Sequence, residues 1–414
     1  MAGELTIDSG DTAWMLVSTA LVLMMLLPGL ALFYGGLVRA KNLLSVMSQT
    51  LGIAAAAILV WIGWGYSLSF ADGNAVVGGL SKVGLAGIDG AAAWATPTAG
   101  EAIPELVFVA FQMTFSAITA ALIIGGLAER VRFSAIMLFT LLWLTIVYAP
   151  LAHMVWAPEG FLFAFGAIDF AGGTVVHVNS GVAGLVGVYF AGARIGHLKE
   201  AMPPHSLALT MVGVGLLWVG WFGFNAGSAL EANGTAAVAM VNTFAAPAAG
   251  IFAWMGAERV VSGKPSMLGG ASGAVAGLVA VTPAAGISGP VGAILLGAVT
   301  GIACYAFVGS LKNRLRLDDS LDVFGIHGIG GIVGSIGTAF VAVPALGGHG
   351  AEDYSLGWQL LRQLAAVGTA IAWSAAGSAL CFAIVRKLVP LRHDKDGERE
   401  GLDISDHGER AYNY

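Results

Sequence analysis

Long apolar runs constrain the fold of this chain more than any other feature. A helix needs about 20 apolar residues to cross a hydrocarbon core of roughly 30 Å, and we find eleven such runs in the 414 residues. Only 11% of the residues are charged, whereas soluble domains carry about 25%. The sequence therefore predicts an all-α integral membrane protein with eleven transmembrane helices, and it excludes disorder, a collagenous repeat and a disulfide scaffold.

The eleven predicted spans are separated by loops of very different length. In order they are Trp14–Val38, Leu43–Phe70, Ile103–Leu127, Ser134–Trp156, Phe170–Ala191, Ser206–Ser228, Ala236–Ala257, Leu268–Thr282, Ile287–Leu311, Val323–Val343 and Trp358–Leu388. We expect a transmembrane domain over residues 1–389 and a polar tail over 390–414. The tail lacks apolar periodicity, so either a solvated segment or a docking segment is expected there.

Basic residues alternate between the loops and predict the orientation. They follow the odd-numbered runs as Arg39, Lys41, Arg130, Arg132, Arg194, Lys199, Arg259, Lys264, Lys312, Arg314 and Arg316. Lys82 alone follows an even-numbered run, and Arg362 lies near the start of the last run. The positive-inside rule then places the odd-numbered loops and the C-terminus in the cytoplasm and the N-terminus outside.

The predicted outer face is acidic. Its carboxylates are Glu4, Asp8, Asp11, Asp72, Asp89, Glu101, Glu105, Glu159, Glu231, Glu352 and Asp353. Such a face would concentrate cations near an entrance, or it would only keep the outer loops soluble.

Several other functions are disfavoured. The net charge is −6 and no basic stripe suggests a nucleic-acid partner. Cys304 and Cys381 lie in apolar runs, so we expect neither a disulfide nor a metal site. The N-terminus has no positive stretch typical of a cleavable signal peptide. Motifs of nucleotide-binding or hydrolytic enzymes are absent from the sequence, so we expect no cofactor and no enzymatic activity.

An internal repeat links the fifth and tenth spans. His177 and His327 each begin the pattern H-x3-G-x2-G-x2-G, and Asp169 and Asp322 lie upstream of them. Five spans of separation reverses the direction in the membrane, which is typical of an inverted repeat with its site between the halves. We expect halves over about 12–200 and 204–345, followed by a final helix over about 357–388. The glycines should allow the two histidines to meet in one pore.

Polar and aromatic residues at membrane depth are the candidate functional residues. A buried ionisable group such as His177 or His327 indicates function by default, although two neutral histidines bonded to backbone are the alternative. Asp169 is either a helix cap or a support for a cation site. Phe111, Phe115, Trp156, Trp221, Phe224 and Ser228 gather near this depth, and aromatic faces attract cations by up to about 2 kcal/mol.

At these residues the sequence resembles the ammonium transporter family (Amt/Mep/Rh), and its bacterial AmtB-type members in particular. The resembling stretches include PGLALFYGGLVRAKN (28–42), AFQMTFSAIT (110–119), AHMVWAPEG (152–160), DFAGGTVVHVNSGVAGLVG (169–187), GWFGFNAGSA (220–229), DDSLDVFGIHGIGGIVG (318–334) and EREGLDISDHGERAY (398–412). The resemblance covers nearly the whole chain.

The resemblance implies a role for each matching residue. It implies an ammonium recruitment site at Trp156, Phe115 and Ser228 with Asp169 as support, and a phenyl gate at Phe115 and Phe224, beside which we place Phe111. It also implies pore histidines at His177 and His327, beside which we place Trp221.

The resemblance further implies a homotrimer in the inner (plasma) membrane that conducts ammonium or ammonia, and methylammonium as well. It implies a PII signal protein (GlnK-like) as a partner at the cytoplasmic face. Two alternatives remain: an ammonium sensor that signals through its tail, and an Rh-like channel for neutral gases, against which the aromatic cation site argues.

Overall fold

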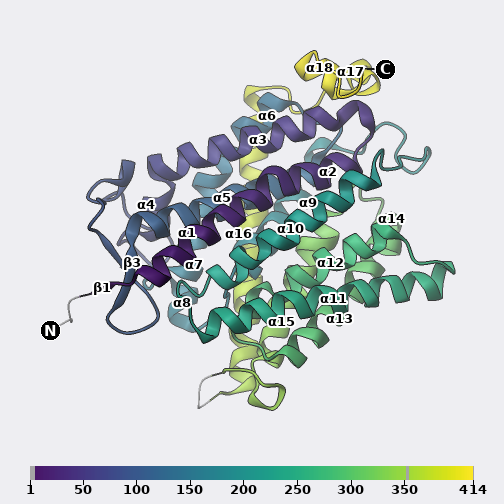
Figure 1. Ribbon diagram of the computed structural model, residues 1–414. Helices are drawn as coiled ribbons and strands as arrows, with labels where there is room; N and C mark the ends of the chain where they lie inside the picture. Colours follow the sequence, from purple (N-terminus) through teal and green to yellow (C-terminus); the bar gives the residue numbers. More distant parts are fainter. Residues whose placement is uncertain (1–4, 351–353, 414) are drawn as a thin grey trace.

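The computed structural model describes residues 5–350 and 354–413. Among these residues, eleven helical segments are long and apolar enough to cross a membrane. Figure 1 shows them as one bundle, with strand β1 at one end and the tail helices α17 and α18 at the other. We call these ends the N-terminal side and the C-terminal side. Three carboxylates expected on the outer face, those of Glu4, Glu352 and Asp353, lie outside the described residues.

Five π-helical or 3-10 turns interrupt the first half of the bundle within its spans. The first five spans comprise α1 (Ser9–Met24), η1 (Met25–Leu30) and α2 (Ala31–Leu37); η2 (Ala40–Asn42), α3 (Leu43–Val60), η3 (Trp61–Gly65) and α4 (Tyr66–Phe70); α5 (Glu105–Leu127); α6 (Phe133–Trp143), η5 (Leu144–Tyr148) and α7 (Ala149–Trp156); and η6 (Gly173–Val178) with α9 (Asn179–Ala191). A short helix, α8 (Phe161–Phe165), follows α7.

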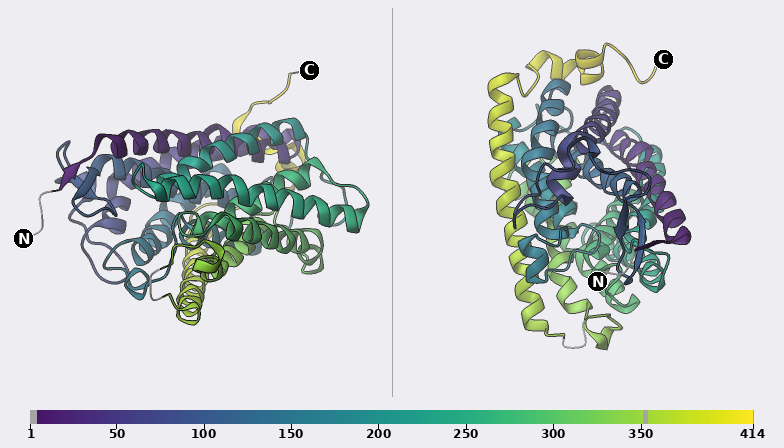
Figure 2. Two further views of the ribbon diagram at one scale, coloured as in Figure 1. Left: turned by 60° about the horizontal axis from the view of Figure 1, so that its bottom comes forward. Right: turned by 90° about the vertical axis from the view of Figure 1, so that its left-hand side faces the viewer.

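The second half contains six further spans. They comprise α10 (Leu207–Gly227); α11 (Gly234–Ser262); α12 (Met267–Val281) with η7 (Thr282–Ala284); α13 (Pro290–Ala306), η8 (Phe307–Leu311) and α14 (Lys312–Arg314); η9 (Phe324–Gly328) with α15 (Ile329–Val341); and α16 (Leu356–Leu388). Figure 2 shows α16 as one long helix along the outside of the bundle. The predicted spans agree with these elements to within a few residues at most ends.

Small elements outside the membrane spans complete the N-terminal side. β1 (Thr6–Ile7), β2 (Ala93–Ala95) and β3 (Glu101–Pro104) form a sheet in the order β1-β3-β2, and η4 (Val83–Leu85) and η10 (Pro344–Leu346) are single turns. β1 is parallel to β3, with Thr6 opposite Glu101, and β2 is antiparallel to β3. The sheet was not expected, because strands this short leave almost no periodic signal in the sequence.

The polar tail is folded onto the bundle, so of the two expected alternatives the docking segment, and not the solvated segment, agrees with the structure. It forms α17 (Lys395–Glu400) and α18 (Leu402–His407), and the side chain of Leu402 is fully buried. Leu402 N donates to Asn42 Oδ1 at 2.9 Å, and Asp403 Oδ1 accepts from Ser45 N at 2.8 Å. Docking of this kind needs only one buried leucine and a few polar partners, so the segment carries no apolar pattern.

Two short helical segments with histidines cross at the centre of the bundle, and they run in opposite directions. The fifth span starts beside Asp169 and ends beside Arg194, which pairs with Asp318 at the start of the tenth span. A Cβ on Gly181 would lie 2.3 Å from Gly328 N, and one on Gly331 would lie 3.0 Å from His177 Cβ. The glycine that follows each histidine by four residues therefore packs against the other repeat.

Candidate functional site

A vestibule of about 160 Å³ opens near the N-terminal side, and it brings four of the predicted residues together. It is lined by Phe111, Phe115, Trp156 and Ser228, together with Phe70, Trp94, Phe108, Gln112, Phe170 and Leu230. The rings of Phe115 and Trp156 meet edge to face at 6.0 Å. Aromatic faces and one hydroxyl group are suited to a small cation that also donates hydrogen bonds.

Asp169 supports this vestibule without lining it. Its Oδ1 accepts from Gly172 N at 3.0 Å, and its Oδ2 accepts from Thr174 N and Val175 N at 3.0 and 3.1 Å. Burial raises the pKa of Asp169, although hydrogen bonds from the Thr174 hydroxyl and the backbone oppose the rise. The carboxylate is thus a cap for η6, while the Asp169 carbonyl accepts from Trp156 Nε1 at 2.9 Å and orients that ring.

Two stacked phenyl rings close the vestibule on its inner side. The centroids of Phe115 and Phe224 lie 4.0 Å apart and the rings are nearly parallel, at 7°. Phe111, which we expected in the gate, contacts Phe115 at 4.9 Å and lines the vestibule. The phenyl stack therefore consists of Phe115 and Phe224.

The two histidines lie beyond this stack. Their Nδ1 atoms are 3.2 Å apart, so the expected contact between the imidazoles is present. The ring of Trp221 packs against His177 at 5.5 Å, and its Nε1 donates to Thr282 Oγ1 at 3.0 Å. The surrounding cavity measures about 10 Å³, near the lower limit for holding one water molecule, which is roughly 10–15 Å³.

The contact between the histidines fixes their proton arrangement. Two neutral imidazoles joined through Nδ1 atoms must be opposite tautomers, because one Nδ1 donates and the other accepts. One Nε2 then carries a lone pair and the other carries a proton. His177 Nε2 has no hydrogen-bond partner among the described residues, so it is free to bond a small molecule in the pore.

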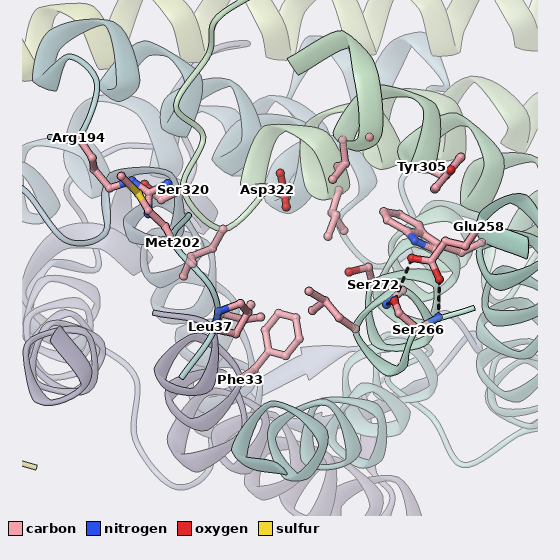
Figure 3. Close-up of a pocket in the computed structure, with 18 residues that line it drawn as sticks. Phe33, Leu37, Arg194, Met202, Glu258, Ser266, Ser272, Tyr305, Ser320 and Asp322 are labelled. Atoms are coloured by element: carbon pink, nitrogen blue, oxygen red, sulfur yellow. Dashed lines mark hydrogen bonds between the residues drawn. The ribbon is translucent and has the colours of Figure 1, made fainter. Parts of the chain in front are cut away.

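A third cavity, of about 300 Å³, opens toward the C-terminal side and is shown in Figure 3. Phe33 lines both this cavity and the histidine cavity. Glu258 faces it and accepts hydrogen bonds from Ser266 N and Oγ at 2.7 and 3.0 Å. The vestibule, the histidine cavity and this third cavity thus form a series through the bundle.

The structure corrects one residue of the predicted repeat. Asp319, and not Asp322, is the counterpart of Asp169: its carboxylate accepts from Val323 N at 3.0 Å and Phe324 N at 2.8 Å, capping η9. Asp319 precedes His327 by eight residues, as Asp169 precedes His177. Asp322 instead pairs with Lys312. The equal spacing was present in the sequence and would have identified Asp319.

Four of the eleven basic residues in the predicted cytoplasmic loops form ion pairs, namely Arg39, Arg130, Arg194 and Lys312. Arg194 bridges Asp318 at 2.7 Å and Glu129 at 3.1 Å. Arg39 also reaches Glu129, at 2.8 Å. Their guanidinium groups hold the pKa of Asp318 and Glu129 below the usual range against the effect of burial. The basic residues in no ion pair among the described side chains include Lys199, Arg259, Lys264, Arg314 and Arg316.

Comparison with known proteins agrees with this geometry. The model of the Ammonium Transporter Family matches residues 13–412. The chain belongs to this family. It is 44% identical to an ammonium transporter of Bacillus subtilis over 410 residues, covering 97% of this chain and 98% of that relative. It is 41% identical to the ammonium transporter Amt1 of Archaeoglobus fulgidus over 406 residues, covering 98% and 100% of the two chains.

Solved structures of the family superpose on the model. The crystal structure of Mep2 from Saccharomyces cerevisiae has a TM-score of 0.83 at 35% identity, covering 94% of this chain and 88% of that one. A sensor Amt protein has a TM-score of 0.88 at 27% identity, covering 96% and 98%. The protein is a multi-pass membrane transporter of ammonium and not an enzyme.

Proposed function

We propose that ammonium is recruited at the aromatic vestibule, loses its proton, and passes the histidine pair as ammonia. The narrow, mostly apolar cavity of about 10 Å³ around His177 and His327 carries this proposal. An intact ion in such surroundings costs tens of kcal/mol by Born solvation, whereas aromatic faces return only about 2 kcal/mol. Deprotonation removes that cost, and potassium has no proton to lose.

The histidine pair supplies the second part of the proposal. A proton released from ammonium crosses separately along the two imidazoles, because each ring can accept a proton on one nitrogen and release one from the other. The ammonia lone pair can accept a hydrogen bond from the protonated Nε2, and an ammonia N–H can donate to the Nε2 that carries a lone pair.

We further propose the orientation and the assembly. Positive-inside loops put the vestibule outside and the tail in the cytoplasm of a cell with this protein in its plasma membrane. Family membership supports a homotrimer with one pore in each subunit, and methylammonium as a second substrate. The transport unit spans residues 1–389, and the tail at 390–414 regulates it from the position described above.

A PII signal protein (GlnK-like) at the cytoplasmic face is proposed on the same family grounds. The unpaired lysines and arginines of that face, with the docked tail beside them, would receive it. Capture of the cognate PII protein by the intact chain, weakened by removal of residues 399–414, supports this proposal. Failure of capture under every nucleotide condition contradicts it.

The decisive experiment measures current in proteoliposomes driven by an ammonium gradient. Replacing both histidines, as His177→Leu with His327→Leu, should abolish proton-coupled transport or admit potassium. His349→Leu is the control, since His349 lines a different cavity. An unchanged current with unchanged selectivity contradicts the proposed role of the pair. A sensor in which transport is incidental would instead show little ammonium flux in the unmodified protein.

A further inference from the structure

Lys82 is held by a cluster of groups that suits an ammonium cation. Its Nζ lies 2.5 Å from Glu105 Oε1, and it sits over the rings of Tyr66 and Trp94, at 5.6 and 5.7 Å from their centroids. Tyr66 Oη donates to the same carboxylate oxygen at 2.6 Å. One carboxylate and two aromatic faces thus surround a primary ammonium group, which is the chemical class of the transported ion.

The cluster is built by the fold and does not depend on Lys82. Tyr66 is fully buried at the start of α4, and Glu105 is the first residue of α5, where the helix dipole stabilises a carboxylate. Trp94 is fixed by stacking on Phe108, with centroids 3.9 Å apart and an angle of 8°. Three separate elements therefore hold the carboxylate and both rings in place.

The cluster also adjoins the vestibule. Trp94 and Phe108, which form the stacked pair, both line the vestibule in which Trp156 and Ser228 lie. A cation that leaves Glu105 therefore has a wall of aromatic faces beside it that continues to the recruitment residues.

We propose that Glu105, Tyr66 and Trp94 form an ammonium-binding site occupied by the tethered ammonium group of Lys82, and that free ammonium or methylammonium exchanges with it before entering the vestibule. This inference rests on the proposed recruitment at the vestibule. The Lys82 side chain is 27% exposed, against 9% for Glu105, so the lysine can swing outward while the carboxylate stays.

The tether sets the concentration at which exchange occurs. A group on a short flexible linker has an effective concentration on the order of mM. Free ammonium therefore displaces Lys82 only at external concentrations on the order of mM, and removing Lys82 should open the site at lower concentrations.

The test is a binding titration of the full-length protein in nanodiscs with methylammonium in sodium-free buffer. At methylammonium concentrations too low to displace Lys82, Lys82→Met should bind one more cation per chain than the unmodified protein. Lys82→Arg, which keeps a cation at the site, and the double variant Lys82→Met with Glu105→Gln should bind no additional cation. Arg362→Met is the matched control, because it removes a positive charge from another cavity on the same side.

Equal stoichiometry at these low concentrations in Lys82→Met and the unmodified protein overturns the inference. An equal gain in Arg362→Met also overturns it, because it would indicate only a change in surface potential. If Lys82→Met does not fold, methylammonium titration of the unmodified protein decides: a second, weaker binding event that Glu105→Gln abolishes supports the site, and a single event refutes it. Transport by the unmodified protein tests the proposed function separately.

Discussion

The two histidine segments of the pore share one local design but differ in what surrounds it. In η6 and in η9, an aspartate eight residues before the histidine caps the first helical turn. Asp169 lies next to the aromatic vestibule, because its backbone carbonyl accepts a hydrogen bond from Trp156 Nε1. Asp319 lies beside Asp322 and the ion pairs of the C-terminal side.

The difference indicates how one repeated element serves two ends of a pore. The aspartate and the glycines that both segments share fix the place where the two histidines meet. Both halves need them, because each half supplies one histidine. The unshared neighbours decide whether the capped end faces a cation-binding vestibule or a charged loop network. Substitutions of the two capping aspartates should therefore have similar structural effects and unequal functional effects, whereas the two glycines differ in how closely the other repeat approaches them.

The largest effect is expected where the two segments touch. Gly181→Ala should destabilise the protein by about 3 kcal/mol or more, because its Cβ would lie 2.3 Å from Gly328 N, which is backbone and cannot turn aside. Gly331→Ala should cost less, about 1–2 kcal/mol, since its nearest contact would be 2.9 Å. Thermal unfolding in detergent measures both.

Gly215→Ala in α10 is the control for these variants. A Cβ there meets no atom within 4 Å, and alanine favours a helix over glycine by about 1 kcal/mol. Its melting temperature should stay equal or rise slightly. Equal stability of the Gly181 and Gly215 variants would show that the close crossing is not what the repeat requires.

An intermediate effect is expected from the two equivalent capping aspartates, Asp169 and Asp319. Asp169→Asn replaces one acceptor oxygen by an NH₂ group facing backbone donors, which should lower stability by about 1–3 kcal/mol, and Asp319→Asn should do the same. Transport should fall about tenfold or more only in the Asp169 variant, because only that cap positions Trp156. Uptake of labelled methylammonium, corrected for the amount of folded protein, distinguishes the two. Equal uptake would mean that the vestibule does not depend on its cap.

The smallest effect concerns pH. Burial beside Asp322 raises the pKa of Asp319 to about 6, from an ordinary 3.8. The protonated form is thus favoured in the folded protein, so this contribution is fully present below pH 3.8 and is lost as the pH rises through 6. The loss is at most about 3 kcal/mol. Melting temperatures between pH 4 and 6.5 should fall less steeply in Asp319→Asn, and an identical slope would refute this assignment.

Acid should act in the opposite direction on the neighbouring Asp318. Arg194 and Arg130 hold its pKa below the usual value, so its contribution is present above pH 3.8 and is lost as the pH falls below it. Two adjacent carboxylates on the C-terminal side therefore respond to pH with opposite sign.

The sequence by itself determined the membrane class, the eleven spans and the residues His177, His327, Phe115 and Trp156. Long apolar runs can be read locally, because a segment in lipid must satisfy its own backbone hydrogen bonds and therefore forms a helix. An ionisable residue within such a run is equally easy to find. The family followed from stretches such as residues 169–187. The eight-residue spacing from Asp319 to His327 is also present in the sequence. Three aspartates, Asp318, Asp319 and Asp322, precede that histidine, and only the spacing distinguishes Asp319 from the other two.

Only the tertiary structure decided which polar groups meet. Arg194 and Asp318 are 124 residues apart, as Lys82 and Glu105 are 23 apart, and no periodic pattern joins such pairs. The docking of the tail depends on Asn42 and Ser45, far away in the chain. Apolar patterning specifies that a helix is buried, but the partner of a charge depends on the geometry of the whole bundle, because a single hydrogen bond requires two atoms to lie within about 3 Å.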